Sequence, residues 1–172
     1  GTGLFSGNAT QRNDLFRSGT SAADLAGIGG RVTLWDVHAV WQPGRWDLRT
    51  LYARGTISQS RQINDVLSAP AVGQTAGFVP KAFDGWFVQA AYDAWRGGDF
   101  ALKPFARYER YDLQRAMPEG YESFRDPLLS ERVLTAGVSL YVGRNAVLKA
   151  DYQRYRADPS RNRVNLGVGY HF

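Results

Sequence analysis

Apolar and polar residues alternate with a period of two along most of the chain from residue 30 onward. Seven runs of roughly 10–14 residues carry this alternation. They are 31–42, 46–58, 83–95, 100–113, 132–142, 146–156 and 162–172. Strands of soluble proteins average about 5–6 residues, whereas a tilted strand that crosses an outer membrane needs about 9–11. The lengths therefore predict an all-β fold, a transmembrane antiparallel up-and-down β-barrel with about seven strands in this chain.

The connections between the runs differ in length in a regular order. Residues 43–45, 96–99 and 143–145 are short turns, residues 59–82 and 114–131 are long loops, and residues 157–161 are intermediate. Barrels of the outer membrane have short periplasmic turns and longer outer loops. If the last residue lies at the periplasmic face, all the short turns fall in the periplasm and all the longer connections fall outside.

Residues 1–29 differ from the rest of the chain. They are rich in Gly, Ser, Thr, Asn and Ala and show little periodicity, so they are predicted to form an extracellular loop segment ahead of the barrel strands in 30–172. Bacterial single-chain barrels have even numbers of strands, eight or more. Either residues 1–29 contain an eighth strand, or the chain is the C-terminal half of a larger barrel. The composition of 1–29 favours the second explanation.

The alternation gives each run an apolar face for lipid and a polar face for the lumen. The lumen face is predicted to carry Asp36, His38, Asp47, Arg49, Asp93, Lys103, Arg107, Glu109, Lys149, Asp151 and Arg163. Charges at these positions would set the ion preference of an open pore. Because acids and bases are balanced, a closed network of salt bridges that fills a narrow barrel is the alternative.

A tyrosine followed two residues later by an arginine recurs on the lipid-facing parity of three runs. The pairs are Tyr52 and Arg54, Tyr108 and Arg110, and Tyr152 and Arg154. We expect them at the outer interface of the membrane, with the tyrosines in an aromatic girdle. The arginines would contact outer-membrane lipids, including the phosphates of lipopolysaccharide, or would only extend into water.

Composition excludes several other functions. The chain of 172 residues has no cysteine, so a disulfide or a cysteine-based metal site is absent, and no run approaches the length of a membrane helix. No metal, cofactor or catalytic motif is present; Asp36 shares the face of His38, but no serine completes a triad. The net charge of +5 is spread between acids along the chain, which does not favour nucleic-acid binding. We therefore predict neither an enzyme nor a cofactor.

Several stretches resemble phosphate-selective-porin-like outer-membrane proteins of Gram-negative bacteria. They are residues 34–38, 46–55, 104–111, 147–153 and 165–172. The resemblance implies a location in the outer membrane. It also implies that the ending Leu166, Val168, Tyr170 and Phe172 is the signal through which the barrel assembly machinery recognises the chain.

Two functions follow as expectations. The first is a porin that forms a water-filled channel for small solutes or ions, with anions such as phosphate among the candidates, as a single barrel or a homo-oligomer such as a trimer. The alternative is a structural barrel that anchors a larger surface or envelope-spanning assembly, for which the long loops and residues 1–29 are the motivation.

Overall fold

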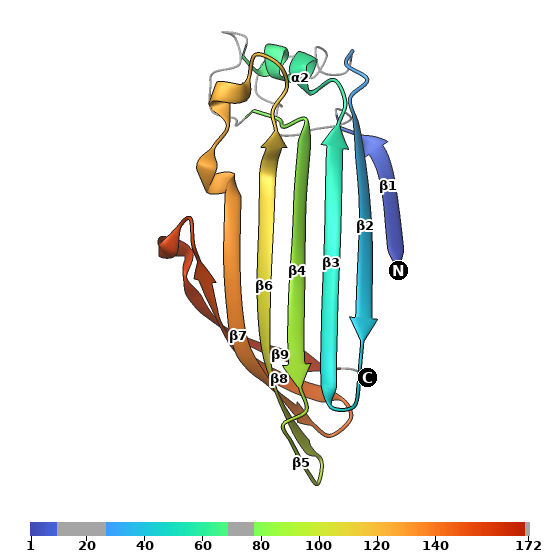
Figure 1. Cartoon of the computed structure of the whole chain (residues 1–172), viewed down its shortest axis with the longest axis vertical. Coiled ribbons are helices and arrows are strands. Elements are labelled where there is room, and N and C mark those ends of the chain that lie inside the picture. The colour runs from blue at the N-terminus through green and yellow to red at the C-terminus, as the bar shows by residue number, and fades with distance from the viewer. Residues whose placement is uncertain (10–26, 69–77, 171–172) are drawn as a thin grey trace.

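One curved antiparallel sheet makes up most of the protein in the computed structural model, which describes residues 1–9, 27–68 and 78–170 (Figure 1). Within these residues the sheet has nine strands in the order β1-β2-β3-β4-β6-β7-β8-β9, with β5 paired to β6. All the pairs are antiparallel. The sheet is not closed, because β1 and β9 form its two edges.

The strands follow one another up and down along the sheet. Their bounds are β1 Thr2–Asn8, β2 Arg31–Trp41, β3 Trp46–Ile57, β4 Ala82–Tyr92, β5 Trp95–Gly97, β6 Phe100–Ala116, β7 Ser130–Val142, β8 Ala146–Tyr155 and β9 Arg163–Tyr170. The predicted runs agree with seven of these strands to within a few residues. The expectation of an all-β, antiparallel, up-and-down arrangement is confirmed.

Three hairpin turns lie together at one end of the sheet (Figure 1). Each contains a glycine in the left-handed region, with φ of 60° at Gly44, 56° at Gly98 and 63° at Gly143. Short β-hairpins need such a residue, and glycine adopts this conformation without a steric penalty from Cβ. The glycines therefore fix the turn end of the sheet.

The opposite end carries the longer connections. Helix α2 (Ser60–Leu67) follows β3, the 3-10 helices η3 (Glu122–Phe124) and η4 (Pro127–Leu129) precede β7, and η5 (Pro159–Arg161) precedes β9. The Asn64 side chain fastens α2 by donating to the carbonyl oxygen of Val79 at 3.0 Å and accepting from its N–H at 2.8 Å. Rings of Phe78 and Phe124, 4.5 Å apart between centroids, join the two long loops.

Two sequence-based expectations were wrong. Residues 2–8 form β1, which pairs with β2 from Thr2 opposite Val37 to Asn8 opposite Arg31, so this part of 1–29 is not a loop. The run 83–95 divides into β4 and β5: the N–H of Asp93 still donates to the carbonyl oxygen of Arg45 at 2.8 Å, whereas the N–H of Ala94 donates to that of Leu102 in β6 at 3.0 Å. The expectation for residues 10–26, and for 69–77 of the long loop, falls outside the described residues.

Aromatic rings lie over glycines on one face of the sheet. Phe83 is opposite Gly55, Tyr111 is opposite Gly85 and Phe105 is opposite Gly137. A Cβ on Gly137 would overlap the carbonyl oxygen of Ala150 and the ring of Phe105. Glycines under aromatic rings allow a sheet to curve while the rings cover the exposed backbone.

Gly137→Ala should therefore destabilise the protein by about 1–3 kcal/mol, the usual range for an added methyl group in a space that cannot hold it. The control is Gly167→Ala, because a Cβ at Gly167 meets no atom within 4 Å. Urea unfolding of the full-length protein in detergent micelles measures the difference. Equal midpoints for the two variants would contradict the account of the curvature.

Candidate functional site

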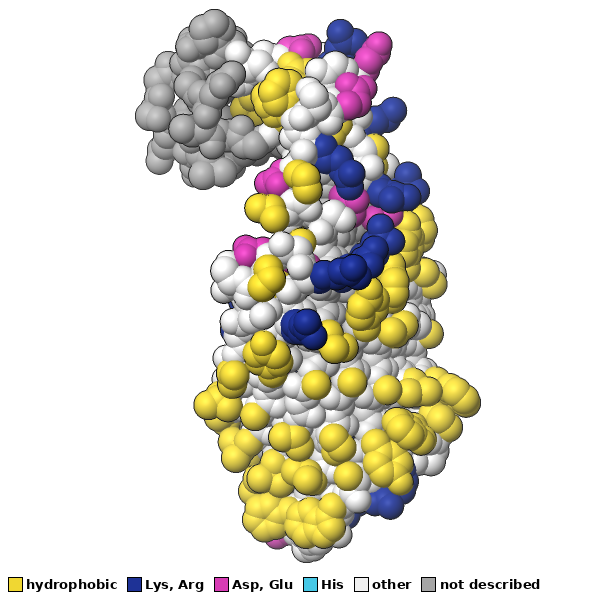
Figure 2. Space-filling view, turned by 60° about the vertical axis from the view of Figure 1, so that its left-hand side comes forward, with side chains coloured by type: hydrophobic (Ala, Val, Ile, Leu, Met, Phe, Trp, Pro, Cys, Tyr) yellow, Lys and Arg dark blue, Asp and Glu magenta, His cyan; other side chains and the backbone are white. Residues whose placement is uncertain are grey.

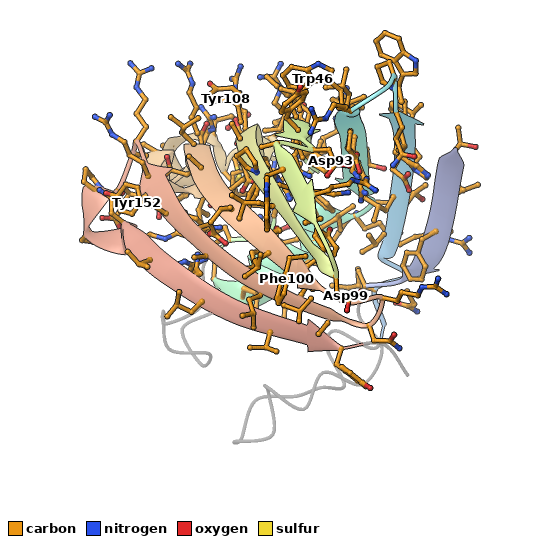
Figure 3. All side chains as sticks on the ribbon, turned by 90° about the horizontal axis from the view of Figure 1, so that it is seen from below. Trp46, Asp93, Asp99, Phe100, Tyr108 and Tyr152 are labelled. Atoms are coloured by element: carbon orange, nitrogen blue, oxygen red, sulfur yellow. The ribbon has the colours of Figure 1, made fainter. Side chains whose placement is uncertain are left out.

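The two faces of the sheet differ in chemistry. Figure 3 looks along the strands from the end with the short turns and shows an open arc with Tyr108 and Tyr152 on its convex side and Asp93 on its concave side. Register explains the separation, because each residue stands opposite a residue of the same face on the next strand: Val37 pairs with Tyr52, and Asp36 pairs with Ala53.

The convex face is a continuous apolar surface that no part of the described chain covers. Trp41 is 66% exposed, Leu166 is 83% exposed and Val168 is 80% exposed. Further exposed apolar residues of this face are Leu4, Trp35, Val37, Trp46, Val88, Leu134, Leu148, Tyr152, Val164 and Tyr170. Soluble monomers rarely expose a contiguous apolar surface of this extent.

Aromatic rings border the apolar surface at both ends. Near the short turns, Trp46 and Tyr92 contact each other with ring centroids 4.9 Å apart. Toward the loops, Trp35 lies 5.3 Å from Tyr52, and Trp86 lies 5.5 Å from Tyr108. Two such rows, with apolar residues between them, have the arrangement of the aromatic girdles of membrane proteins.

A row of arginines follows directly beyond the aromatic residues at the loop end. Arg54 is opposite Trp35, Arg110 is opposite Trp86, and Arg154 is opposite Leu134. Figure 2 shows dark-blue Lys and Arg side chains gathered above an extended yellow surface. The arginines thus lie where the apolar surface ends.

The concave face carries both acidic and basic side chains, and most of them are paired along their own strand. The ion pairs join residues two positions apart: Asp47 with Arg49 at 2.7 Å, Arg107 with Glu109 at 2.8 Å and Lys149 with Asp151 at 3.3 Å. His38 Nδ1 is 2.9 Å from Asp36 in the same way. Residues i and i+2 of a strand share a face, so their side chains can meet. The opposite charges of each pair then largely cancel within the strand.

Aromatic rings of other strands contact three cations of the concave face. Arg107 lies 3.9 Å from the ring centroid of Phe87, Lys149 lies 4.7 Å from that of Phe105, and Lys103 lies 5.0 Å from that of Tyr141. Each contact is a cation–π interaction. Each of the three cations therefore contacts both a carboxylate and an aromatic ring.

Asp93 joins the concave face to the turn end. Arg96 donates to it from Nε at 2.8 Å, and Lys103 Nζ is 3.9 Å away. The hydrogen bond from Arg96, aided by the charge of Lys103, lowers the pKa of Asp93 below its usual range although burial opposes this shift. A polar hollow of about 270 Å³ between Asp93, Arg45 and Gln42 opens beside the pair.

The sequence-predicted site residues lie on the faces that parity assigned to them. All the charged positions predicted for the lumen are on the concave side; of these, Arg163 donates to Gln153 at 2.8 Å. The three tyrosine–arginine pairs are on the convex side. Leu166, Val168 and Tyr170 are exposed in β9, and Phe172 lies outside the described residues.

Sequence reasoning missed two arginines, Arg132 and Arg156. Arg132 is opposite Arg110 on the convex parity, and the N–H of Arg156 donates to its carbonyl oxygen at 3.1 Å. The first could have been found from its spacing of two residues from Leu134. The second depends on the course of the loop after β8.

Comparisons with known proteins give one relative and no function. An uncharacterized protein of Aquifex aeolicus (strain VF5) is 33% identical over 151 residues, which cover 86% of this chain and 34% of that protein. The chain therefore spans about a third of the length of this curated relative. No protein-family model matches the chain. No solved structure matches it either.

Among the residues that the structure describes, no helix combines the length and the apolar character needed to cross a membrane.

Proposed function

We propose that the chain is part of the wall of an outer-membrane β-barrel, with the convex face in lipid and the concave face lining a water-filled pore. The observation that carries the proposal is the distribution of apolar residues, which is the reverse of that in a soluble protein: they are exposed on the outer face of the sheet and largely absent from a buried core. The buried apolar side chains of the described residues are all at the loop end: Ile63, Leu67, Ala82, Met117, Val133 and Tyr155. Among the described residues, the long strands have no buried apolar core beneath them, and their extended apolar surface is on the convex face, whereas concave rings such as Phe87 and Phe105 contact cations.

The height of the apolar surface fits a membrane. From Arg132 to Val142, β7 rises about 33 Å along the strand, which is about 25 Å along the barrel axis at a tilt of about 40°. The apolar band of outer-membrane barrels has the same height, about 25 Å. At both ends of this band, aromatic residues are followed by charged residues, as expected at the interface between lipid and water.

The open edges of the sheet support a larger barrel. In lipid every backbone N–H and C=O needs a partner, so a sheet that crosses a membrane has to close. Within the described residues, β1 pairs with β2 alone and β9 with β8 alone. We therefore expect further strands of the full-length protein at both edges. The relative, of which the chain spans about a third, is long enough to contain them.

The concave face favours a weakly selective pore. Asp47, Glu109 and Asp151 each form an ion pair with a basic residue of the same strand, and the same pairing reduces the attraction of anions. Charged rings select ions by their net field, and paired charges contribute little to it. Small solutes and ions of either sign would pass, and phosphate would have no special site in this part of the wall.

Insertion of such a barrel would depend on the assembly machinery. The alternating, exposed Leu166, Val168 and Tyr170 of β9 are the part of the expected signal that the structure describes. They point outward from an edge strand, where another protein could reach them before the barrel closes. Whether the barrel acts alone or as a homo-oligomer does not change this step.

Neutralising two concave cations tests the pore. Arg107→Gln combined with Lys149→Gln removes the cationic partners of Glu109 and Asp151, so the wall gains two net negative charges. The reversal potential of the full-length protein in planar bilayers under a KCl gradient should move toward that of K⁺. Glu109→Gln combined with Asp151→Asn should move it toward that of Cl⁻, and the convex Leu148→Val should leave it unchanged.

If the barrel conducts but neither double variant changes its reversal potential, permeating ions do not pass this face. A wild-type barrel that inserts but does not conduct would contradict the pore and favour the anchoring role.

Labelling of introduced cysteines tests the orientation. Glu119, whose side chain is 87% exposed, lies in the loop before η3, and the exposed Arg144 lies in the turn before β8. On intact cells a membrane-impermeant maleimide should label Glu119→Cys, while Arg144→Cys should react only after the outer membrane is permeabilised. The opposite pattern would invert the proposed topology.

A further inference from the structure

Four arginines from three strands and one loop meet at the loop end of the convex face. Arg110 of β6 is directly opposite Arg132 of β7, Arg154 of β8 is opposite Leu134, and Arg156 follows β8. We call these four residues the arginine cluster. Arg132, Arg154 and Arg156, with Tyr108, line a hollow of about 450 Å³.

The arginine cluster lacks acidic partners. In the described part of the chain, no carboxylate forms an ion pair with any of its four guanidinium groups, whereas Arg49, Arg96 and Arg107 are each paired. Like charges directly opposite each other on neighbouring strands are destabilising. The facing Arg110 and Arg132 therefore call for an anion from outside the chain.

The carboxylate of Glu131, which precedes Arg132 in the chain, does not supply that anion. Glu131 is fully buried on the concave parity, opposite Tyr111. Its oxygens accept from the backbone N–H groups of Arg132, Arg156 and Ala157 at 2.8–2.9 Å and from that of Asp158 at 3.3 Å. Glu131 thus fixes the chain after β8 and holds Arg156 beside Arg132, while its own acceptors are occupied.

An apolar groove continues from the hollow toward the short turns. Tyr108 and Leu134 line both spaces. The groove has a volume of about 510 Å³ and runs over small residues such as Ala90 and Ala106 as far as Trp41. A molecule with an anionic head and an apolar tail would place the head among the arginines and the tail in the groove.

We infer that the arginine cluster and the groove together bind a phosphorylated lipid of the outer leaflet. Guanidinium groups bind phosphate oxygens bidentately, and an acyl chain fits the apolar groove below them. The inference rests on the proposed membrane location and adds a lipid site outside the pore. It assigns to Arg132 and Arg156 the binding of a lipid phosphate, which their position on the convex parity alone does not show.

The test compares binding of three probes to the full-length protein in detergent micelles, measured by native mass spectrometry. The probes are lipid A with two phosphates, the same lipid after removal of both phosphates, and inorganic phosphate. The wild type should prefer the phosphorylated lipid. In Arg132→Gln combined with Arg154→Gln, the affinity should fall on the order of tenfold or more, as the loss of charge-assisted hydrogen bonds predicts.

The matched control is Arg61→Gln combined with Arg115→Gln, which removes two arginines of the loop end that pair with Glu119 and Asp84 outside the hollow, and it should keep the affinity. Equal binding by wild type and cluster variant, or equal binding of the dephosphorylated lipid, would overturn the inference. Displacement of the lipid by equimolar inorganic phosphate would show a site for the free anion and would also overturn it. If the wild type inserts and conducts without preferring the phosphorylated lipid, only this inference fails; if it never inserts into bilayers, the proposed function fails with it.

Discussion

The register of the antiparallel ladder is the constraint on which the other features of this protein depend. A strand has a side-chain period of two, so a shift of one residue would move all its apolar positions to the other face. The pairing of Tyr52 with Trp86 and of Arg49 with Gln89 shows how the ladder keeps the faces separate across the sheet. The apolar surface, the two aromatic rows and the charged concave wall all follow from this alignment. Turn glycines maintain the register at one end, and the Glu131 contacts maintain it at the other.

The two faces handle charge in opposite ways. On the concave side, carboxylates and cations alternate along the strands and neutralise one another, as Lys149 and Asp151 do. On the convex side, the four arginines of the cluster form no ion pair with a carboxylate of the described residues, and three of them line a hollow together with Tyr108 of the aromatic row. A water-filled pore tolerates charges that are paired or hydrated, whereas the boundary of a lipid layer offers phosphates to arginines. The proposed pore and the proposed lipid site are thus consequences of one arrangement.

Much of this arrangement could be predicted from the sequence, because parity within a run is a local property. Strand bounds and faces depend on alternation that the residues themselves display. β1 could not be found in this way, since Gly3 and Gly7 interrupt its alternation and its strand form depends on pairing with β2. α2 is too short to be stable alone, and its place depends on the contact of Asn64 with Val79. Arg156 joins the arginine cluster only through the folded loop after β8, which no local pattern shows.

The central claim is that the convex face lies in lipid and the concave face in water. Spin labels placed singly at Val138, Ser139, Leu140 and Tyr141 of β7 in the full-length, reconstituted protein test it most directly. Collision rates with oxygen should be high at positions 138 and 140, and collision rates with a water-soluble nickel complex should be high at 139 and 141. Oxygen accessibility that does not alternate along β7, or that is highest at 139 and 141, would contradict the account.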